Sequence, residues 1–448
     1  MVVFVNNIAR ISYYLLAGIN RLNWSRQRLE KYQNKKLRNV VKYAYNNVQF
    51  YHQLFRASNV NPSDIKTISD LSKLPVVRKK EMRKRERTNL ISKEFSNAKL
   101  KRLSTGGSTG EPFSIYVCGK EDDWRKAIYL RAHISCGLRP RDRWVALDAV
   151  ERAAENTRLQ NIIGIFSRKV IPVNLDKMLQ LEAITRLNPN VLDGACSSGA
   201  LWLLAKEAEE RGVHSIRPRV IFGTGDLIDR PSRNFIEKVF DAPYYDQFGT
   251  TEVDRTAWQC QERIHYHMDV DSVVMQFIDE DGQEVAPGER GEIVFTSLFS
   301  YAMPFIRYGT LDIGVPVEDE CTCERTLPLM KVVEGRSNSF LTFPDGHVIA
   351  PMSFIETLKA YELSKEIDQY RVVQKRKNLV ELYVKKTNDE VDEETIRNRL
   401  IANILEGLTT AEKVDLSDVR FDVRFVDEIP LTTRGKLKVV VSEVPAFT

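Results

Sequence analysis

The chain has 448 residues, 43% of them hydrophobic and 28% charged, with a formal net charge of +5 at pH 7. This composition excludes an intrinsically disordered protein, and the length predicts more than one domain because single cores rarely grow beyond about 250–300 residues. The 66 basic and 61 acidic residues are too evenly balanced to indicate a protein that binds nucleic acid.

The N-terminal segment 1–24 is apolar in pieces, and Asn6, Asn7 and Arg10 interrupt it. No segment of the sequence approaches the roughly 20 consecutive apolar residues that a membrane-spanning helix needs. The segment also lacks the positively charged start and the small-residue cleavage site of a secretory signal, so we expect a cytoplasmic protein. We predict an amphipathic helix packed on the body, with weak peripheral contact to a membrane as the alternative.

Apolar residues recur at helical spacing over residues 25–60, which predicts helices there. Residues 77–87, VRKKEMRKRER, form a dense cationic segment. We expect this segment to be a solvated helix face, because charge runs are usually exposed. A patch that binds a membrane or an anionic polymer is the alternative.

The stretch STGGSTGEP (104–112) is rich in glycine and hydroxyl groups and precedes FSIYV, an alternating run that predicts a strand. Small residues let backbone N–H groups turn toward an anion, and the hydroxyls add further donors. The stretch has no Gly-Lys-Ser/Thr and no following helix, so it is not a Walker-type phosphate loop. A loop that only turns the chain is the alternative.

Short apolar strands alternate with helical stretches over residues 143–241, which predicts βαβ units and a largely parallel sheet. Residues 270–300 instead alternate strictly and contain Asp-Gly and Pro-Gly turns, which predicts antiparallel strands. After residues 332–341 the pattern indicates a compact α+β piece. We therefore predict two domains, an N-terminal domain of residues 1–335 and a C-terminal domain of residues 336–448.

The stretch YYDQFGTTEV (244–253) sets an aromatic ring, hydroxyl groups and a carboxylate at an expected strand end. Phe248 is suited to stack on a planar base, Thr251 to bond a phosphate oxygen, and Glu252 to hold Mg²⁺. A plain turn with a surface glutamate is the alternative interpretation.

Three later stretches carry further charged groups. Asp312 in IRYGTLDIG (306–314) is a carboxylate suited to a pair of ribose hydroxyls. Arg336 lies at the predicted domain boundary, and Lys436 lies in a Gly-anchored, hairpin-like segment near the C-terminus. A lysine near a chain end is ordinarily solvated.

Together, in this order and spacing, these stretches resemble the adenylate-forming superfamily and are most similar to its phenylacetate–CoA ligase branch, which includes capsule-biosynthesis relatives. The stretches YQNKKLRNVVKYAYNNVQFYHQLF (32–55) and DLSKLPVVRKKEMR (70–83) are also similar to that branch, so the resemblance spans nearly the whole chain. It implies an α/β fold in which a large body of mixed parallel sheets, helices and an antiparallel β subdomain precedes a small mobile α+β lid. It also implies an ATP-dependent acid–thiol ligase that uses Mg²⁺, a carboxylic acid and coenzyme A.

The resemblance implies a role for each matching position. The loop would surround the phosphates of ATP through seven positions: Ser104, Thr105, Gly106, Gly107, Ser108, Thr109 and Gly110. The adenine side of the nucleotide site would be built from Gly223, Thr224, Gly225, Asp226, Phe248 and Gly249. The remaining polar groups would be Thr251 for the α-phosphate, Glu252 for Mg²⁺, Asp312 for the ribose, Arg336 at the hinge and Lys436 for the carboxylate and α-phosphate.

The sequence departs from the branch at three places. Residues 337–339 read Ser-Asn-Ser, where a basic or polar residue and a second Asp usually follow the hinge arginine, which bears on domain rotation more than on adenylation. Asp226 stands where Glu is usual, and Gly309 and Leu311 alter the surroundings of Asp312.

Two alternative functions remain open. The first changes the acceptor to an amine, a carrier-protein thiol or a sugar group in surface-polymer synthesis. The second, motivated by the altered hinge, is a nucleotide-binding scaffold without catalysis. The sequence leaves the acid and the oligomeric state open, a homodimer included.

The chain has six cysteines, and three of them can join one histidine as a tetrahedral set: Cys260, His267, Cys321 and Cys323. Three thiolates and one imidazole suit a structural Zn²⁺, and some members of the branch carry a similar set. The alternatives are reduced thiols without metal, and His265 in place of His267. We expect the other cysteines, Cys118, Cys136 and Cys196, to be core residues.

Residues 190–202, NVLDGACSSGALW, lie where the branch forms the wall of its acid pocket. Small side chains there leave room for a bulky or aromatic acid: Ala195, Ser197, Ser198 and Gly199. The same residues are also typical of the start of a helix.

Overall fold

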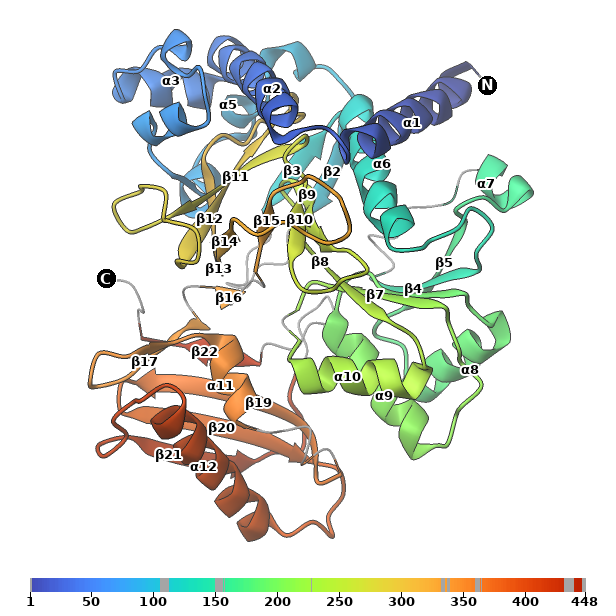
Figure 1. Ribbon diagram of the computed structural model, residues 1–448, viewed down its shortest axis with the longest axis vertical. Helices are drawn as coiled ribbons and strands as arrows, with labels where there is room; N and C mark the ends of the chain where they lie inside the picture. The colour runs from blue at the N-terminus through green and yellow to red at the C-terminus, as the bar shows by residue number, and fades with distance from the viewer. Residues whose placement is uncertain are drawn as a thin grey trace. The chain divides into compact units, whose positions relative to one another are not determined.

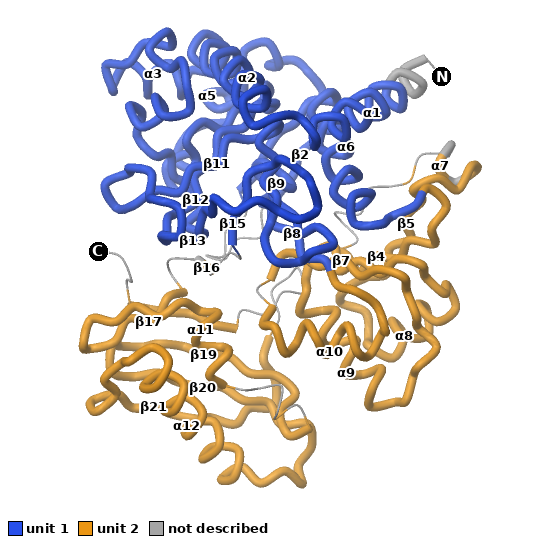
Figure 2. Tube along the Cα trace, viewed as in Figure 1, with its two compact units in different colours: residues 1–139, 245–333 blue, residues 140–244, 334–448 orange. Residues whose placement is uncertain are grey.

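The computed structural model describes residues 2–104, 113–149, 156, 158–226, 228–331, 335–336, 339–358, 363, 365–430 and 439–444. Two compact units are each built from two stretches of chain (Figure 2). Unit 1 comprises residues 1–139 and 245–333, and unit 2 comprises residues 140–244 and 334–448. The predicted domains 1–335 and 336–448 stay a prediction.

Unit 1 begins with helices, and its second stretch is almost entirely strands (Figure 1). Its α-helices are α1 Val2–Arg21, α2 Arg26–Asn47, α3 Gln49–Ala57, α4 Lys79–Arg83, α5 Arg87–Leu90 and α6 Gly119–Ser135, and its short 3₁₀ helices are η1 Pro62–Asp64, η2 Ser69–Lys73 and η3 Lys93–Phe95. Its strands are β1 Val77–Arg78, β2 Lys101–Ser104, β3 Ser114–Val117, β8 Tyr244–Thr250, β9 Asp254–Gln259, β10 Tyr266–Met268, β11 Val273–Ile278, β12 Gly291–Ser297, β13 Tyr308–Gly314, β14 Pro316–Val317 and β15 Leu329–Met330.

The strands of unit 1 form antiparallel sheets with one parallel edge. One sheet has the order β1-β13-β12-β11, in which β1 pairs parallel with β13 and the other pairs are antiparallel. A second run, β14-β15-β10-β9-β8, is antiparallel throughout, and β2 and β3 form a hairpin. The antiparallel strands predicted over residues 270–300 are confirmed.

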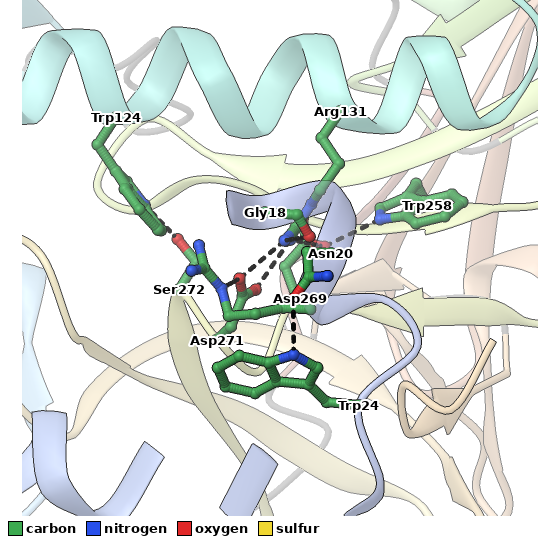
Figure 3. Close-up of polar contacts among 10 residues, drawn as sticks. Gly18, Asn20, Trp24, Trp124, Arg131, Trp258, Asp269, Asp271 and Ser272 are labelled. Carbon is green, nitrogen blue, oxygen red and sulfur yellow. Dashed lines mark hydrogen bonds and ion pairs between the residues drawn. The ribbon is translucent and has the colours of Figure 1, made fainter. Parts of the chain in front are cut away.

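A buried charge cluster lies beside these strands (Figure 3). The Arg131 side chain is fully buried, and its guanidinium donates to Asp269 Oδ1 at 2.5 Å and to both carboxylate oxygens of Asp271 at 2.8 and 2.9 Å. Arg21 donates to Asp271 at 2.6 Å, and the Trp258 indole donates to Asp269 at 2.9 Å. Two guanidinium groups thus balance two carboxylates. Charged side chains can be buried away from water when they are paired in this way.

The two carboxylates of this cluster differ in their charge partners. Burial raises the pKa of Asp269 to about 6, against the opposing effect of Arg131. Burial acts on Asp271 in the same direction, but Arg131 and Arg21 together outweigh it and hold the pKa of this carboxyl below its usual value. Asp269 is therefore the group whose ionisation costs more in the folded state.

Helix α1 packs on α6, as the sequence predicts. Arg10 Nε donates to Asp123 at 2.6 Å, Tyr14 meets the edge of the Trp124 ring, and the Gly18 carbonyl accepts from Arg131. The predicted helices over residues 25–60 are α2 and α3, whose apolar faces join a core with β1, β3, β11 and β13. Among the helices that the structure describes, none is long and apolar enough to cross a bilayer.

The first stretch of unit 2 alternates strands with helices. Its elements are β4 Trp144–Asp148, α7 Arg158–Ile163, β5 Arg168–Pro172, α8 Lys177–Leu187, β6 Val191–Gly194, α9 Ser198–Glu210, β7 Val220–Thr224 and α10 Arg230–Phe240. The strands pair in parallel in the order β7-β6-β4-β5, and α8, α9 and α10 pack along them over one apolar core (Figure 1). The predicted parallel sheet is confirmed.

The second stretch of unit 2 is an α+β piece. Its elements are β16 Gly335–Arg336, β17 Leu341–Thr342, β18 Val348–Ile349, α11 Pro351–Thr357, β19 Ile367–Arg376, β20 Leu379–Lys386, α12 Glu393–Thr410, β21 Arg420–Phe425 and β22 Val440–Ser442. Four strands form a sheet in the order β21-β20-β19-β22, and α11 and α12 share its core (Figure 1). This arrangement confirms the α+β character predicted for the region.

Candidate active site and candidate metal centre

The glycine-rich stretch joins the two strands of a hairpin. Ser104 ends β2 and pairs with Ser114 of β3, so the predicted strand after the loop is present. The other loop positions of the sequence prediction lie outside the described residues: Thr105, Gly106, Gly107, Ser108, Thr109 and Gly110. Their role around a phosphate chain stays a prediction.

The YYDQFGTTEV stretch forms strand β8 and a tight turn, and the return strand β9 follows it. β8 pairs antiparallel with β9, and Thr251 and Glu252 lie in the turn between them. Gly249 is required here because a Cβ atom would lie 2.9 Å from the Arg255 Cα atom, closer than real contacts allow. The close approach of the two backbones therefore fixes where the turn begins.

Arg125 of α6 fixes this turn from the side. Its guanidinium donates to the Thr251 carbonyl at 2.8 Å and to the Glu252 carbonyl at 3.3 Å, and its Nε atom lies 3.6 Å from a carboxylate oxygen of Asp254. A planar fork that holds two consecutive carbonyls constrains the backbone direction. The helix thus determines how the Thr251 and Glu252 side chains are presented.

The Glu252 carboxylate is buried, with only 6% of the residue exposed. Its Oε1 atom accepts a hydrogen bond of 2.9 Å from the Tyr308 hydroxyl and lies 3.8 Å from Lys79 Nζ. Within the described part of the chain, no hydrogen bond to Oε2 is found. The carboxylate is therefore buried and held in place through Oε1. A carboxylate of this kind matches the hard oxygen ligand that Mg²⁺ prefers. The alternative of a surface glutamate is wrong.

Asp312 and Phe248 belong to the same unit as Glu252. Asp312 lies in β13 with 8% of the residue exposed, directly after Leu311, whose φ is +66°. That left-handed residue interrupts the strand alternation beside Asp312. The Phe248 ring lies 6.2 Å from the Phe295 ring at a shallow angle.

The predicted GTGD stretch ends β7 of unit 2. Gly223 and Thr224 are the last strand residues, and Gly225 has a φ of +91°, which favours glycine. The Asp226 carboxylate accepts a hydrogen bond from the Ser197 hydroxyl. A Cβ atom on Gly223 would collide with the ring of Tyr244.

The small residues predicted to leave room in an acid pocket are partly used in local structure. Ser197 is the N-cap of α9 and accepts from the Ala200 amide at 3.1 Å. Ser198 accepts from the Tyr244 hydroxyl at 2.7 Å and is fully buried. The helix-start alternative is therefore confirmed for Ser197.

Of the two charged groups expected at the lid, one lies among the described residues. Arg336 is the second residue of β16, and Lys436 lies outside the described residues. The role of each stays a prediction.

Four side chains come together at one end of the β9–β10 hairpin. The ligand atoms of Cys260, His267, Cys321 and Cys323 all lie within 4.8 Å of one another. Cys260 directly follows β9, His267 lies in β10, and the other two cysteines lie in the loop between β14 and β15. The sequence predicted this set, although 61 residues separate Cys260 from Cys321.

The donor set fits a tetrahedral metal ion. Cys323 Sγ lies 3.3 Å from His267 Nε2, and Cys260 Sγ lies 3.5 Å from Cys321 Sγ. Burial lowers the pKa of His267 to about 4, so the imidazole is neutral and able to ligate at neutral pH. His265 is not one of the four residues of the cluster, and its Nε2 atom lies 3.3 Å from an Asp319 carboxylate oxygen.

The remaining cysteines differ from one another. Cys136 and Cys196 are buried, as predicted, and Cys118 is half-buried at the N-cap of α6. The prediction of a core position is therefore wrong for Cys118, because the start of a helix lies closer to the surface than the strands around it.

Sequence reasoning missed three residues around Glu252. Tyr308 lies inside the quoted IRYGTLDIG stretch, but only Asp312 was singled out there. Lys79 was included in a cationic segment interpreted as solvated, and Arg125 lies in a helix without a motif. Only the folded chain brings these side chains to the turn.

Comparison with known proteins finds relatives over most of the chain. A phenylacetate–coenzyme A ligase of Thermus thermophilus is 24% identical over 366 residues, which cover 80% of this chain and 80% of that protein. Protein CapK of Staphylococcus aureus is 20% identical over 441 residues, which cover 92% and 89%. No family model matches the sequence.

Solved structures share the fold. A 2-hydroxyisobutyryl-CoA ligase, crystallised in the postadenylation state with 2-HIB-AMP, has a TM-score of 0.76 at 19% identity and covers 94% of this chain and 91% of its own. This likeness confirms the predicted fold class.

Proposed function

We infer that this chain, which belongs to the adenylate-forming superfamily in the branch of the phenylacetate–CoA ligases and CapK, activates a carboxylic acid with ATP and transfers it to coenzyme A. The observation that carries the proposal is the Thr251–Glu252 turn. It presents a buried carboxylate, fixed by the Tyr308 hydroxyl, of the kind that Mg²⁺ prefers as a ligand. The similarity to a phenylacetate–coenzyme A ligase, which covers 80% of that protein, supports the proposal.

In the first half-reaction, an oxygen of the acid attacks the α-phosphorus of ATP. The bond from the α-phosphorus to the β-phosphate oxygen breaks, and pyrophosphate leaves with the electron pair. A carboxylate and a triphosphate repel each other, so positive charge must neutralise the transition state. Glu252 would hold Mg²⁺, which would supply part of this charge.

The other residues of this chain bind and orient the substrates. Thr251 bonds the α-phosphate, and Asp312 accepts from the ribose hydroxyls. Lys436 neutralises charge between the carboxylate and the α-phosphate. The remaining nucleotide contacts come from the loop 104–110, from Gly223, Thr224, Gly225 and Asp226, and from Phe248 and Gly249.

In the second half-reaction, the thiolate of coenzyme A attacks the acyl carbonyl and AMP leaves. Lys436 is needed only in the first step. We propose that residues 336–448 form a small mobile domain, in which Arg336 lies at the hinge and which withdraws the lysine before the thiol approaches.

A pyrophosphate-release assay over a panel of aryl and acyl carboxylic acids tests the function. We expect release that depends on one acid class and is retained without coenzyme A, and AMP release that requires coenzyme A. AMP release that does not require coenzyme A, with the correct acid, would favour an amine, carrier-protein or sugar acceptor. MgATP binding without turnover of any acid would contradict the ligase and favour a scaffold.

We also propose that Cys260, His267, Cys321 and Cys323 hold a structural Zn²⁺. Four protein ligands complete a tetrahedral shell, so the ion would stabilise the strand ends and take no part in the reaction. The six cysteines are not joined in disulfides, which suits the reducing cytoplasm, where we propose to place the protein.

Elemental analysis checks the metal site. The purified protein is expected to contain about one zinc ion per chain. Cys323→Ala should lower this content well below one and reduce the thermal midpoint, because the metal–ligand free energy is part of the folding free energy. Cys118→Ala is the matched control and should retain the metal. A full zinc content in Cys323→Ala would contradict the assignment.

A further inference from the structure

Positive charge is concentrated in the N-terminal part of the chain. Residues 1–100 contain 21 lysines and arginines and 6 acidic residues, which gives a formal charge of +15. The other 348 residues contain 45 basic and 55 acidic residues, which gives a formal charge of −10. The small net charge of the protein is therefore the sum of two parts of opposite sign. Such asymmetry indicates that the basic part faces an anionic surface or polymer.

Helix α2 presents much of this charge to solvent on one face. Its 22 residues include seven lysines and arginines and one acidic residue, Glu30. Four of the exposed basic residues are Arg28, Lys31, Lys35 and Lys42. They follow one another at intervals of 3, 4 and 7 residues, which places them on the same side of a helix. The opposite side of α2 packs into the core of unit 1, so the basic side faces water.

Helix α1 presents large apolar side chains on its outer face. Tyr13 and Leu16 are 69% and 67% exposed, although the other side of the helix packs on α6. With Asn20, which is also exposed, they follow one another at intervals of 3 and 4 residues and share one face. Burial of such side chains away from water is favourable. This face is therefore suited to contact an apolar medium.

A chain of contacts joins the two faces across the turn between the helices. The Trp24 indole donates to Asn20 Oδ1 at 2.9 Å (Figure 3), and the Arg28 Cζ atom lies 3.8 Å from the centre of the Trp24 ring. The outer face of α1 therefore continues, through an aromatic ring, into the basic face of α2. We call this region the α1–α2 surface and define it by Tyr13, Leu16, Trp24, Arg28, Lys31, Lys35 and Lys42.

The combination of groups on the α1–α2 surface indicates its partner. Tyrosine and tryptophan are enriched at membrane–water interfaces, and lysine and arginine beside an amphipathic helix are attracted by anionic lipid headgroups. A nucleic acid would use the charges but leave Tyr13 and Leu16 in water. A second copy of the chain would bring the same positive charges face to face, and like charges repel each other.

We propose that the α1–α2 surface binds the face of a bilayer that contains anionic phospholipids. Tyr13 and Leu16 enter the boundary between headgroups and acyl chains, while the basic side chains of α2 contact lipid phosphates. Helix α1 is thus packed on the protein body on one side and contacts the membrane on the other. The proposal goes beyond the ligase function and does not depend on it, because no residue of this surface belongs to the candidate active site.

Flotation of the full chain with lipid vesicles tests the proposal. One vesicle sample contains phosphatidylglycerol and phosphatidylcholine in equal amounts, and the other contains phosphatidylcholine alone. We expect the protein to float with the anionic vesicles and to stay in solution with the neutral ones. Binding should weaken between about 0.1 M and about 1 M salt, because the Debye length shortens from about 10 Å to about 3 Å.

A charge variant measures the contribution of the basic face. In the double variant Lys31→Gln/Lys35→Gln we expect affinity for the anionic vesicles about 20- to 30-fold weaker, since each basic side chain near the surface contributes about fivefold. The double variant Lys238→Gln/Lys377→Gln is the matched control, because it removes the same charge from exposed positions of unit 2. This control should bind the vesicles as the unmodified chain does.

An apolar variant measures insertion into the bilayer. Leu16→Ser should bind the anionic vesicles about 10-fold more weakly although its charge is unchanged, because the apolar area that enters the bilayer is smaller. Ile264→Ser is the matched control, since Ile264 is 68% exposed elsewhere in unit 1, and it should bind normally. All these variants should keep the thermal midpoint of the unmodified chain, because the replaced side chains are exposed.

Three results would overturn the proposal. The first is equal affinity for anionic and neutral vesicles, or for the charge variant and its control. The second is equal affinity of Leu16→Ser and Ile264→Ser, which would show that Leu16 does not enter the bilayer. The third is binding of a DNA duplex, or self-association that Leu16→Ser abolishes, without binding of anionic vesicles.

Discussion

Replacing Arg131 with methionine is expected to lower the free energy of unfolding by about 3–5 kcal/mol, the range observed when one partner of a buried ion pair is removed. The guanidinium is fully buried and contacts Asp269 and Asp271. Its loss leaves Arg21, which contacts Asp271, as the remaining guanidinium of the cluster described above. Urea unfolding followed by tryptophan fluorescence measures the effect, because Trp258 and Trp124 lie within the cluster (Figure 3).

The deficit should depend on pH. The pKa of Asp269 is raised to about 6 in the folded chain, so its contribution to stability already falls as the pH rises toward that value. Without Arg131 the pKa rises further, and protonation at low pH relieves the buried charge. The loss should therefore be smaller at pH 5 than at pH 8.

Arg26→Met is the matched control for this prediction. Arg26 is an exposed arginine at the start of α2, and its replacement should change stability by less than about 0.5 kcal/mol. A deficit below about 1 kcal/mol in Arg131→Met, or one that grows as the pH falls, would show that the cluster does not stabilise the fold in this way.

Replacing Glu252 with glutamine is expected to reduce acid-dependent pyrophosphate–ATP exchange by about 10²–10³-fold, as for the loss of one group that stabilises developing charge. Glutamine keeps the size of the side chain and an oxygen that can accept from the Tyr308 hydroxyl. The turn and its contacts with Arg125 should therefore persist while the charge that holds Mg²⁺ is lost.

Two measurements make this result specific. Exchange by Glu252→Gln should recover partly at higher Mg²⁺ concentration, and its thermal midpoint should stay close to that of the unmodified chain. Glu280→Gln, at an exposed position of the same unit, should behave as the unmodified chain. If Glu252→Gln exchanged pyrophosphate at a rate within about threefold of the unmodified chain, Glu252 would not be the magnesium ligand.

Local patterns were sufficient to predict most elements of the fold. The alternation of strands and helices over residues 143–241 predicted the parallel strands β4 to β7, and strict alternation predicted the β11–β12 pair. These predictions hold because side-chain periodicity reflects which face of an element is buried. The cysteine–histidine set was also found, since thiol and imidazole ligands are few in the chain.

The surroundings of Glu252 could not be predicted in the same way. Arg125 contacts the turn from a helix 126 residues earlier in the chain, and Lys79 reaches it through a parallel pairing of only two residues. No sequence period marks such contacts. The sequence likewise does not predict that Arg131 is a core residue, because its burial depends on two carboxylates that are distant in sequence.

The division of unit 1 into two stretches has a consequence during synthesis of the protein. Arg131 leaves the ribosome 138 residues before Asp269 does, and residues 140–244 are translated in between. At about 5–20 residues per second, this delay lasts roughly 7 to 28 s. During that time Arg131 lacks its counter-charges, Asp269 and Asp271. The first stretch of unit 1 therefore cannot complete its core until the strands of the second stretch have been synthesised.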